Sequence, residues 1–214
     1  MKEPFEIVFD DDYLIVVNKI AKVLIQASKK EAKHTLTSLL QQRVGSKVFP
    51  CHRLDRETTG LVVYARSPEI QRKITDQFRS REIKKKYIAF VKGNLKKRKG
   101  VWEGKIIDRE GKIFAEKSKY AKTFYRVLKD FPNWSILELS PVTGRTNQLR
   151  IQLAKIDHPI LGEDKYAFRR DFKVKFKRLG LHAFYLNFIH PISKQKINLE
   201  LNLPKDMQEF LNSF

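Results

Sequence analysis

Short apolar runs rich in β-branched and aromatic residues, separated by turn-forming residues, recur along the first two thirds of this chain. Runs of this length and composition, bounded by turn residues, are typical of strands. A turn over residues 10–12, all aspartate, separates the first two such runs and indicates a hairpin. The segments that predict strands are 5–9, 13–17, 62–65, 84–93, the two halves of 122–139 on either side of Pro132-Asn133, and a run around 181–183.

Helical spacing is confined to a few short segments. Leucines at 36, 39 and 40 predict a helix over 35–43 that ends near Gly45. Ser67 followed by Pro68 is a typical helix start and predicts a helix to about residue 79. Further helices are expected over 144–154, directly after a strand, and after Pro204.

Many strands with few, short helices predict an α+β fold. We find no internal repeat, low-complexity linker or break in composition, so residues 1–214 are expected to form a single domain. The basic stretch 94–120 is expected to be a hairpin or an insertion.

The net charge of the chain indicates that this globular domain has a polyanionic partner. The chain has 44 Lys and Arg against 24 Asp and Glu, a formal net charge of +20. Such a field attracts nucleic acid or an anionic membrane surface. No apolar run approaches the roughly 20 residues of a transmembrane helix, and the N-terminus has no secretory pattern. With one cysteine, Cys51, expected to be a small buried residue, we predict a cytoplasmic protein without a disulfide or membrane association.

One stretch carries candidate chemistry: residues 52–61, HRLDRETTGL, place Asp55 between two arginines just before a strand. In isolation, an Arg-Leu-Asp tripeptide would indicate a surface ion pair on a turn. The whole stretch, however, resembles the active-site motif H-R-L-D-x-x-T-S-G-L of the RluA-type RNA pseudouridine synthases, from which it departs only at Thr59. Segments 84–93, 144–154 and 178–191 are similar to further motifs of that family, in the same order.

The resemblance implies the pseudouridine synthase fold, a mixed and largely antiparallel sheet with flanking helices and a central active-site cleft. It also implies an enzyme that needs neither a metal ion nor an organic cofactor, acts on rRNA or tRNA, and is a monomer. Many relatives carry an N-terminal S4 RNA-binding domain. Because the catalytic pattern begins within the first ten residues, we expect no such domain here.

The resemblance assigns Asp55 as the catalytic carboxylate, acting at the sugar of a flipped-out uridine by attack at C1′ or by removal of the C2′ proton. Arg150 is expected to hold that carboxylate ionised, since burial alone would raise its pKa. Tyr87 is expected to stack on the uracil or to relay the C5 proton. A tyrosine on a strand is more commonly structural, so both alternatives stay open.

The remaining site residues are expected to bind RNA. Arg53 would displace the target nucleotide from its stack. Gly144, Arg145 and Thr146, at a strand-to-helix junction, are expected to contact phosphate. Departures from the family are Asn147 and Gln152, where histidine is common, and Glu163, where aspartate is common. The other residues that we assign to RNA or substrate binding are His52, Thr58, Leu181 and His182.

Two alternatives remain. The basic and aromatic stretch 168–178 fits either an exposed strand or an RNA-binding surface. The whole chain could also be a non-catalytic RNA-binding or ribosome-assembly factor on the same fold. The presence of Asp55, Tyr87 and Arg150 together favours the enzyme, because a binding protein does not need the carboxylate.

Overall fold

The computed structural model describes residues 3–26, 34–107, 118–168, 170 and 172–214. These fall into two compact units. Unit 1 comprises Met1–Lys84 with Ala183–Asn202, and unit 2 comprises Lys85–His182 with Leu203–Phe214. Each unit therefore combines one long continuous piece with a short segment from residues 183–214.

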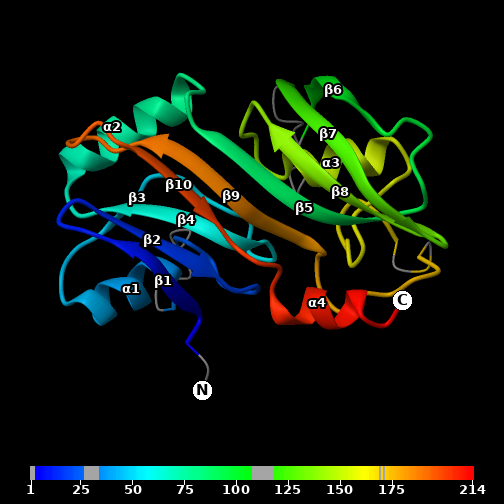
Figure 1. Cartoon of the computed structure of the whole chain (residues 1–214), viewed down its shortest axis with the longest axis horizontal. Helices are drawn as coiled ribbons and strands as arrows, with labels where there is room; N and C mark the ends of the chain where they lie inside the picture. The colour runs from blue at the N-terminus through cyan, green and yellow to red at the C-terminus, as the bar shows by residue number, and fades with distance from the viewer. Residues whose placement is uncertain (1–2, 27–33, 108–117, 169, 171) are drawn as a thin grey trace. The chain divides into compact units, whose positions relative to one another are not determined.

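The strands of unit 1 follow the order β1-β2-β4-β9, with β3 paired to β4 and β10 paired to β9 (Figure 1). The pairing of β1 with β2, of β2 with β4 and of β10 with β9 is antiparallel. Their bounds are Phe5–Asp10 for β1, Leu14–Lys19 for β2, Phe49–Pro50 for β3, Thr59–Ala65 for β4, Leu181–Ile189 for β9 and Lys196–Glu200 for β10.

Two helices complete unit 1. Helix α1, Leu36–Val44, begins at Thr35, whose hydroxyl accepts a hydrogen bond from the Ser38 N–H, and ends at Gly45 with φ of +69°. Helix α2, Pro68–Arg79, begins at Ser67, whose hydroxyl accepts from the Ile70 N–H at 3.3 Å. The buried residues Ile70 and Ile74 of α2 join a core formed with residues of β2, β4 and β9.

Unit 2 contains the strand order β5-β8-β7-β6, again with antiparallel pairing (Figure 1). One core lies between these strands and α3, and an aromatic cluster around the fully buried Trp134 packs against α4. The bounds are Lys84–Lys92 for β5, Lys99–Ile106 for β6, Lys119–Phe131 for β7, Trp134–Pro141 for β8, Gln148–Lys155 for α3 and Lys205–Leu211 for α4.

The predicted α+β fold with a largely antiparallel sheet is confirmed. The four predicted helices are present, but the one expected over 144–154 begins only at Gln148. In the stretch 94–120, expected to be a hairpin or an insertion, β6 pairs with β7 as a hairpin, and residues 108–117 lie outside the described residues. The described residues of 168–178 form no strand: Phe172 is buried and Phe176 packs against Phe90 and Phe210. The single domain over 1–214 stays a prediction, because a division into contact units does not say whether each unit folds alone. In the described ranges no helix is long and apolar enough to cross a membrane.

Gly60 generates a prediction about the start of β4. It has φ of +120°, and a Cβ there would lie 2.2 Å from the carbonyl oxygen of Ala183. We expect Gly60→Ala to lower the free energy of unfolding by more than about 1 kcal/mol, from backbone strain and from the clash. Urea unfolding measures this. Gly104→Ala is the matched control, because Gly104 has φ of +144° with nothing within 4 Å; equal losses for both variants would show that the close approach has no energetic weight.

Candidate active site

The loop between β3 and β4 carries the motif around Asp55. The Thr58 N–H donates to the Asp55 carbonyl at 3.1 Å, which closes a turn. Asp55 is half-buried, whereas Arg53 and Arg56 are exposed. The half-buried carboxylate of Asp55 is therefore flanked along the chain by two exposed arginines.

A buried lysine holds this loop in place. Lys19, at the end of β2, is 0% exposed, and its ammonium donates to the carbonyls of Ile20, Val23 and Arg56 at 2.9, 3.0 and 3.0 Å. The Arg56 carbonyl also accepts from the Lys22 N–H at 2.8 Å. Because hydrogen bonds from a charged donor are strong, Lys19 fixes the backbone one residue after Asp55. Lys19 is a positioning residue that the sequence did not reveal.

His52 and Thr58 occupy different environments in the same loop. The His52 Nε2 accepts from the Val63 N–H at 3.0 Å, and its ring lies 4.5 Å from that of Phe78. An accepting Nε2 requires the proton of the neutral ring to be on Nδ1. The Thr58 hydroxyl is buried and meets no hydrogen-bond partner in the described part of the chain, which leaves it unsatisfied at a cost of about 1–3 kcal/mol.

In unit 2, Arg150 is fixed by a two-pronged ion pair. Its Nε and Nη2 donate to the two carboxylate oxygens of Glu163 at 2.7 and 2.5 Å. Arg150 is 3% and Glu163 0% exposed. The Arg150 Nη1 also donates to Asn147 Oδ1 at 3.3 Å. Asn147, where relatives commonly have histidine, thus helps to orient the arginine.

The Glu163 carboxylate stays charged despite its burial. Burial alone would raise its pKa, but the Arg150 guanidinium and the N–H groups of Lys165 and Tyr166 outweigh that effect, so the pKa is lowered from its ordinary value of 4.5. The N–H groups of Asp164, Lys165 and Tyr166 donate to the same oxygen at 3.0, 2.8 and 3.3 Å. The turn after Gly162 is therefore wrapped around one carboxylate.

The exposed loop of Gly144, Arg145 and Thr146 lies between β8 and α3, at the predicted strand-to-helix junction. Gln148 braces it: its Oε1 accepts from the Thr143 hydroxyl at 2.6 Å and from the Arg145 N–H at 3.0 Å. The amine of Lys85 lies against the loop, since a Cβ on Gly144 would be 3.1 Å from its Nζ. Burial lowers the pKa of Lys85 to about 8.

Gln152 forms its hydrogen bonds within unit 2. Its Oε1 accepts from the buried Thr123 hydroxyl at 2.7 Å, and its Nε2 donates to the Trp102 carbonyl at 3.2 Å. It ties α3 to β6 and β7.

The other predicted residues of unit 2 are more deeply set. Tyr87, on β5 opposite Leu139, is partly buried against the core of the unit. Leu181 belongs to that same core at 3% exposure, and His182 is 0% exposed. Tyr87 is of intermediate exposure.

The predicted site residues divide between the units. His52, Arg53, Asp55 and Thr58 come together in one loop of unit 1, and Tyr87, Gly144, Arg145, Thr146, Arg150, Leu181 and His182 are in unit 2. Cys51, predicted to be a small buried residue, is 6% exposed, and burial raises its pKa to about 12. Among the described residues there is no group of three or more His, Cys, Asp or Glu that could hold a metal ion.

Known proteins resemble the chain over most of its length. A family described as RNA pseudouridylate synthase matches residues 13–155. Ribosomal large subunit pseudouridine synthase D of Nitrosomonas europaea is 35% identical over 225 residues, which cover 98% of this chain but only 65% of that protein. tRNA pseudouridine synthase C of Haemophilus influenzae is 32% identical over 232 residues, 98% of this chain and 97% of that protein. The structure of human RNA pseudouridylate synthase domain containing 4 aligns with a TM-score of 0.79 at 26% identity, over 96% of this chain and 91% of that one.

Lys19 generates a prediction about the stability of the loop. Lys19→Met removes the ammonium and leaves carbonyls at Ile20, Val23 and Arg56 without that donor. We expect a loss of about 3 kcal/mol in the free energy of unfolding, measured by urea titration. Lys47→Met, at an exposed lysine of unit 1, is the control and should change stability by under about 0.5 kcal/mol. Similar small values for both would remove the anchoring role of Lys19.

Glu163 generates a prediction about pH. Glu163→Gln leaves Arg150 buried without its counter-charge and should cost about 3–5 kcal/mol of stability at neutral pH. Because the folded pKa of Glu163 is lowered, its contribution is present above the ordinary value of 4.5 and is lost as the pH falls through the folded pKa. The gap between wild type and variant should therefore narrow in acid, in unfolding curves recorded across that range. Asp164→Asn, whose side chain is 50% exposed, should show only a small gap.

Proposed function

This chain belongs to the RNA pseudouridylate synthase family, and on that premise we propose that it isomerises uridine to pseudouridine in an rRNA or a tRNA. The observation that carries the proposal is similarity over 98% of the chain to enzymes named for both kinds of RNA. That similarity also favours an enzyme over a non-catalytic RNA-binding factor. The family match includes residues 52–61 and confirms their resemblance to the pseudouridine synthase motif.

The reaction needs a carboxylate at the sugar and no added water. The N1–C1′ bond breaks, the uracil turns, and a C5–C1′ bond forms; the C5 proton leaves and N1 gains one. Positive charge develops on the sugar as the first bond breaks, as in glycoside hydrolysis. Asp55 is the group that we assign to this charge, by attack at C1′ or by removal of the C2′ proton. Its turn, fixed by Lys19, supports the assignment because catalytic groups must be held in place.

Two residues of unit 2 share the chemistry in this proposal. Arg150 is assigned to the active site through the family motif in which it stands, and its guanidinium is held in one direction by Glu163. Tyr87, which is of intermediate exposure, stacks on the uracil or relays the C5 proton. Neither role requires a metal ion or an organic cofactor.

RNA binding is assigned to the exposed cations and loops. Arg53 is exposed and suited to displacing the target nucleotide from its stack. Gly144, Arg145 and Thr146 form an exposed loop beside the Lys85 amine, a favourable setting for a phosphate. Thr58, Leu181 and His182 are assigned to substrate binding only through the family motifs in which they stand, since all three are buried. His52 is better suited to bracing the loop than to touching RNA, because its ring already binds Val63.

The partner in this proposal is RNA, attracted by the net charge of +20. We further propose a monomer located in the cytoplasm.

Asp55 provides the direct test. Asp55→Asn should abolish release of tritium from C5-tritiated uridine in rRNA and tRNA, assayed separately, because the amide cannot stabilise or attack the sugar. RNA affinity should stay within a few-fold, since the side chain keeps its shape. Glu57→Gln, at the neighbouring half-buried carboxylate, is the matched control and should keep its activity.

Wild type that releases no tritium from either RNA pool would refute the proposed activity. A variant Asp55→Asn with normal turnover would refute the role of Asp55 alone. If circular dichroism showed that Asp55→Asn does not fold, Asp55 would have a structural role instead of the catalytic one.

A further inference from the structure

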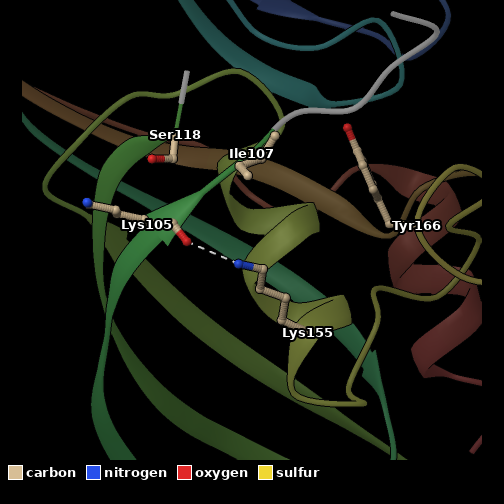
Figure 2. Close-up of a pocket in the computed structure, with 5 residues that line it drawn as sticks. All are labelled: Lys105, Ile107, Ser118, Lys155 and Tyr166. Atoms are coloured by element: carbon tan, nitrogen blue, oxygen red, sulfur yellow. Dashed lines mark hydrogen bonds between the residues drawn. The ribbon is translucent and has the colours of Figure 1, made fainter. Parts of the chain in front are cut away.

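The two faces of the β6–β7 hairpin in unit 2 have different surroundings. On the inward face, Trp102 and Tyr125 stack with their ring centres 4.1 Å apart and pack against the core of the unit. Helix α3 lies against this inward face, and its Lys155 ammonium donates to the Lys105 carbonyl at 3.1 Å (Figure 2). The alternate residues of both strands therefore form the opposite face of the hairpin.

This outer face, formed by Lys99 and Val101 of β6 with Phe124 and Arg126 of β7, carries an exposed apolar pair. Val101 and Phe124 lie directly opposite each other and are 41% and 49% exposed. No aromatic ring in the described part of the chain packs against Phe124. Because Val101 lies about 17 Å along β6 from Ile106, its last paired residue, the apolar pair belongs to the body of the hairpin.

Two cations lie directly opposite each other beside this apolar pair. Lys99 faces Arg126 two residues along each strand from Val101 and Phe124, and both cationic residues are exposed. Like charges in directly opposite positions destabilise a sheet. Arg126 reaches Glu138 at 3.4 Å, whereas Lys99 forms no ion pair with any residue that the structure describes. A bound anion would relieve the repulsion between the two cations.

The neighbouring charges decide which kind of partner suits the outer face. The Lys122 ammonium lies 5.4 Å from the centre of the Phe124 ring and pairs with Glu103 at 3.0 Å. Lys86 of β5 pairs with Glu138 at 3.4 Å. Together with the two opposed cations, these four positive groups share two carboxylates. The remaining positive charge attracts a polyanion and repels a second copy of this chain, whose net charge is +20.

We propose that the outer face of the hairpin binds an unpaired segment of the RNA substrate. The inference rests on the proposed function, since it takes RNA to be the substrate. A base stacks on Phe124 beside Val101, and a phosphate lies between Lys99 and Arg126, about 7 Å away along the strands. An aromatic ring with cations beside it is a common means of holding single-stranded nucleic acid.

The segment bound here does not contain the target uridine. Tyr87, which we assign to the target uracil, lies opposite Leu139 and packs with the core on the inward face of the sheet. In β7, Tyr125 pairs with that same Leu139, and its neighbour Phe124 points to the other face. The outer face would thus contribute to the affinity for RNA without taking part in the isomerisation.

The test measures the dissociation constants of total tRNA and of total rRNA, separately, by filter binding. Phe124→Thr removes the ring at an exposed strand position and should weaken binding of the preferred RNA about ten-fold, whereas Phe124→Tyr keeps a ring and should stay within about two-fold. Lys99→Gln should weaken binding about three-fold. The matched controls in unit 1 are Ile192→Thr, at an apolar residue that is 42% exposed, and Lys47→Gln, at an exposed lysine; each should change binding less than about two-fold.

Equal effects of Phe124→Thr and Ile192→Thr would overturn the proposed surface, as would equal effects of the two lysine variants. A wild-type dimer in sedimentation equilibrium that Phe124→Thr converts to a monomer, with unchanged RNA affinity, would also overturn it and assign the outer face to contacts between copies. Circular dichroism checks folding, and if Phe124→Thr does not fold, the comparison of Lys99→Gln with Lys47→Gln decides. Tritium release by the wild type, measured in parallel, reports on the proposed function alone, so the two can fail separately.

Discussion

The buried pair of Arg150 and Glu163 is the interaction on which the unit 2 part of the proposed site depends. An arginine at 3% exposure is tolerated only with a counter-charge, and Glu163 supplies it with two short hydrogen bonds. The carboxylate in turn collects three backbone N–H groups from the turn that follows it. One glutamate thus sets the direction of the guanidinium, the course of residues 163–166 and the placement of the Tyr166 ring.

Local signals allowed much of the fold to be predicted. The caps at Thr35, Gly45 and Ser67 act through neighbouring backbone groups, so their effect is visible in the sequence. Strand β10 was missed although its residues alternate polar and apolar, because it is only 5 residues long and is held by pairing with β9. The stretch 168–178 suggested a strand, yet Phe176 is held by Phe90 and Phe210, residues far away along the chain.

The same distinction applies to the site. Asp55, Tyr87 and Arg150 could be named because they stand in motifs of a known family. Lys19 could not, because its role requires a carbonyl 37 residues further along the chain to lie within reach. Glu163 was noted as a departure from aspartate, but its pairing with Arg150 depends on how the turn after Gly162 packs, which residue types alone do not reveal. Where a buried charge has its partner far away along the chain, that partner can therefore be identified only from the three-dimensional structure.

The way in which both units use the end of the chain has a consequence for synthesis. Unit 1 includes 183–202, which supply most of β9 and all of β10, and unit 2 includes 203–214, where α4 packs Phe210 against Trp134. Neither unit can be complete until its segment from 183–214 has been synthesised, so unit 1 cannot finish folding before the central residues of unit 2 have been made. In each unit the segment made last completes the packing, β9 and β10 in unit 1 and α4 in unit 2.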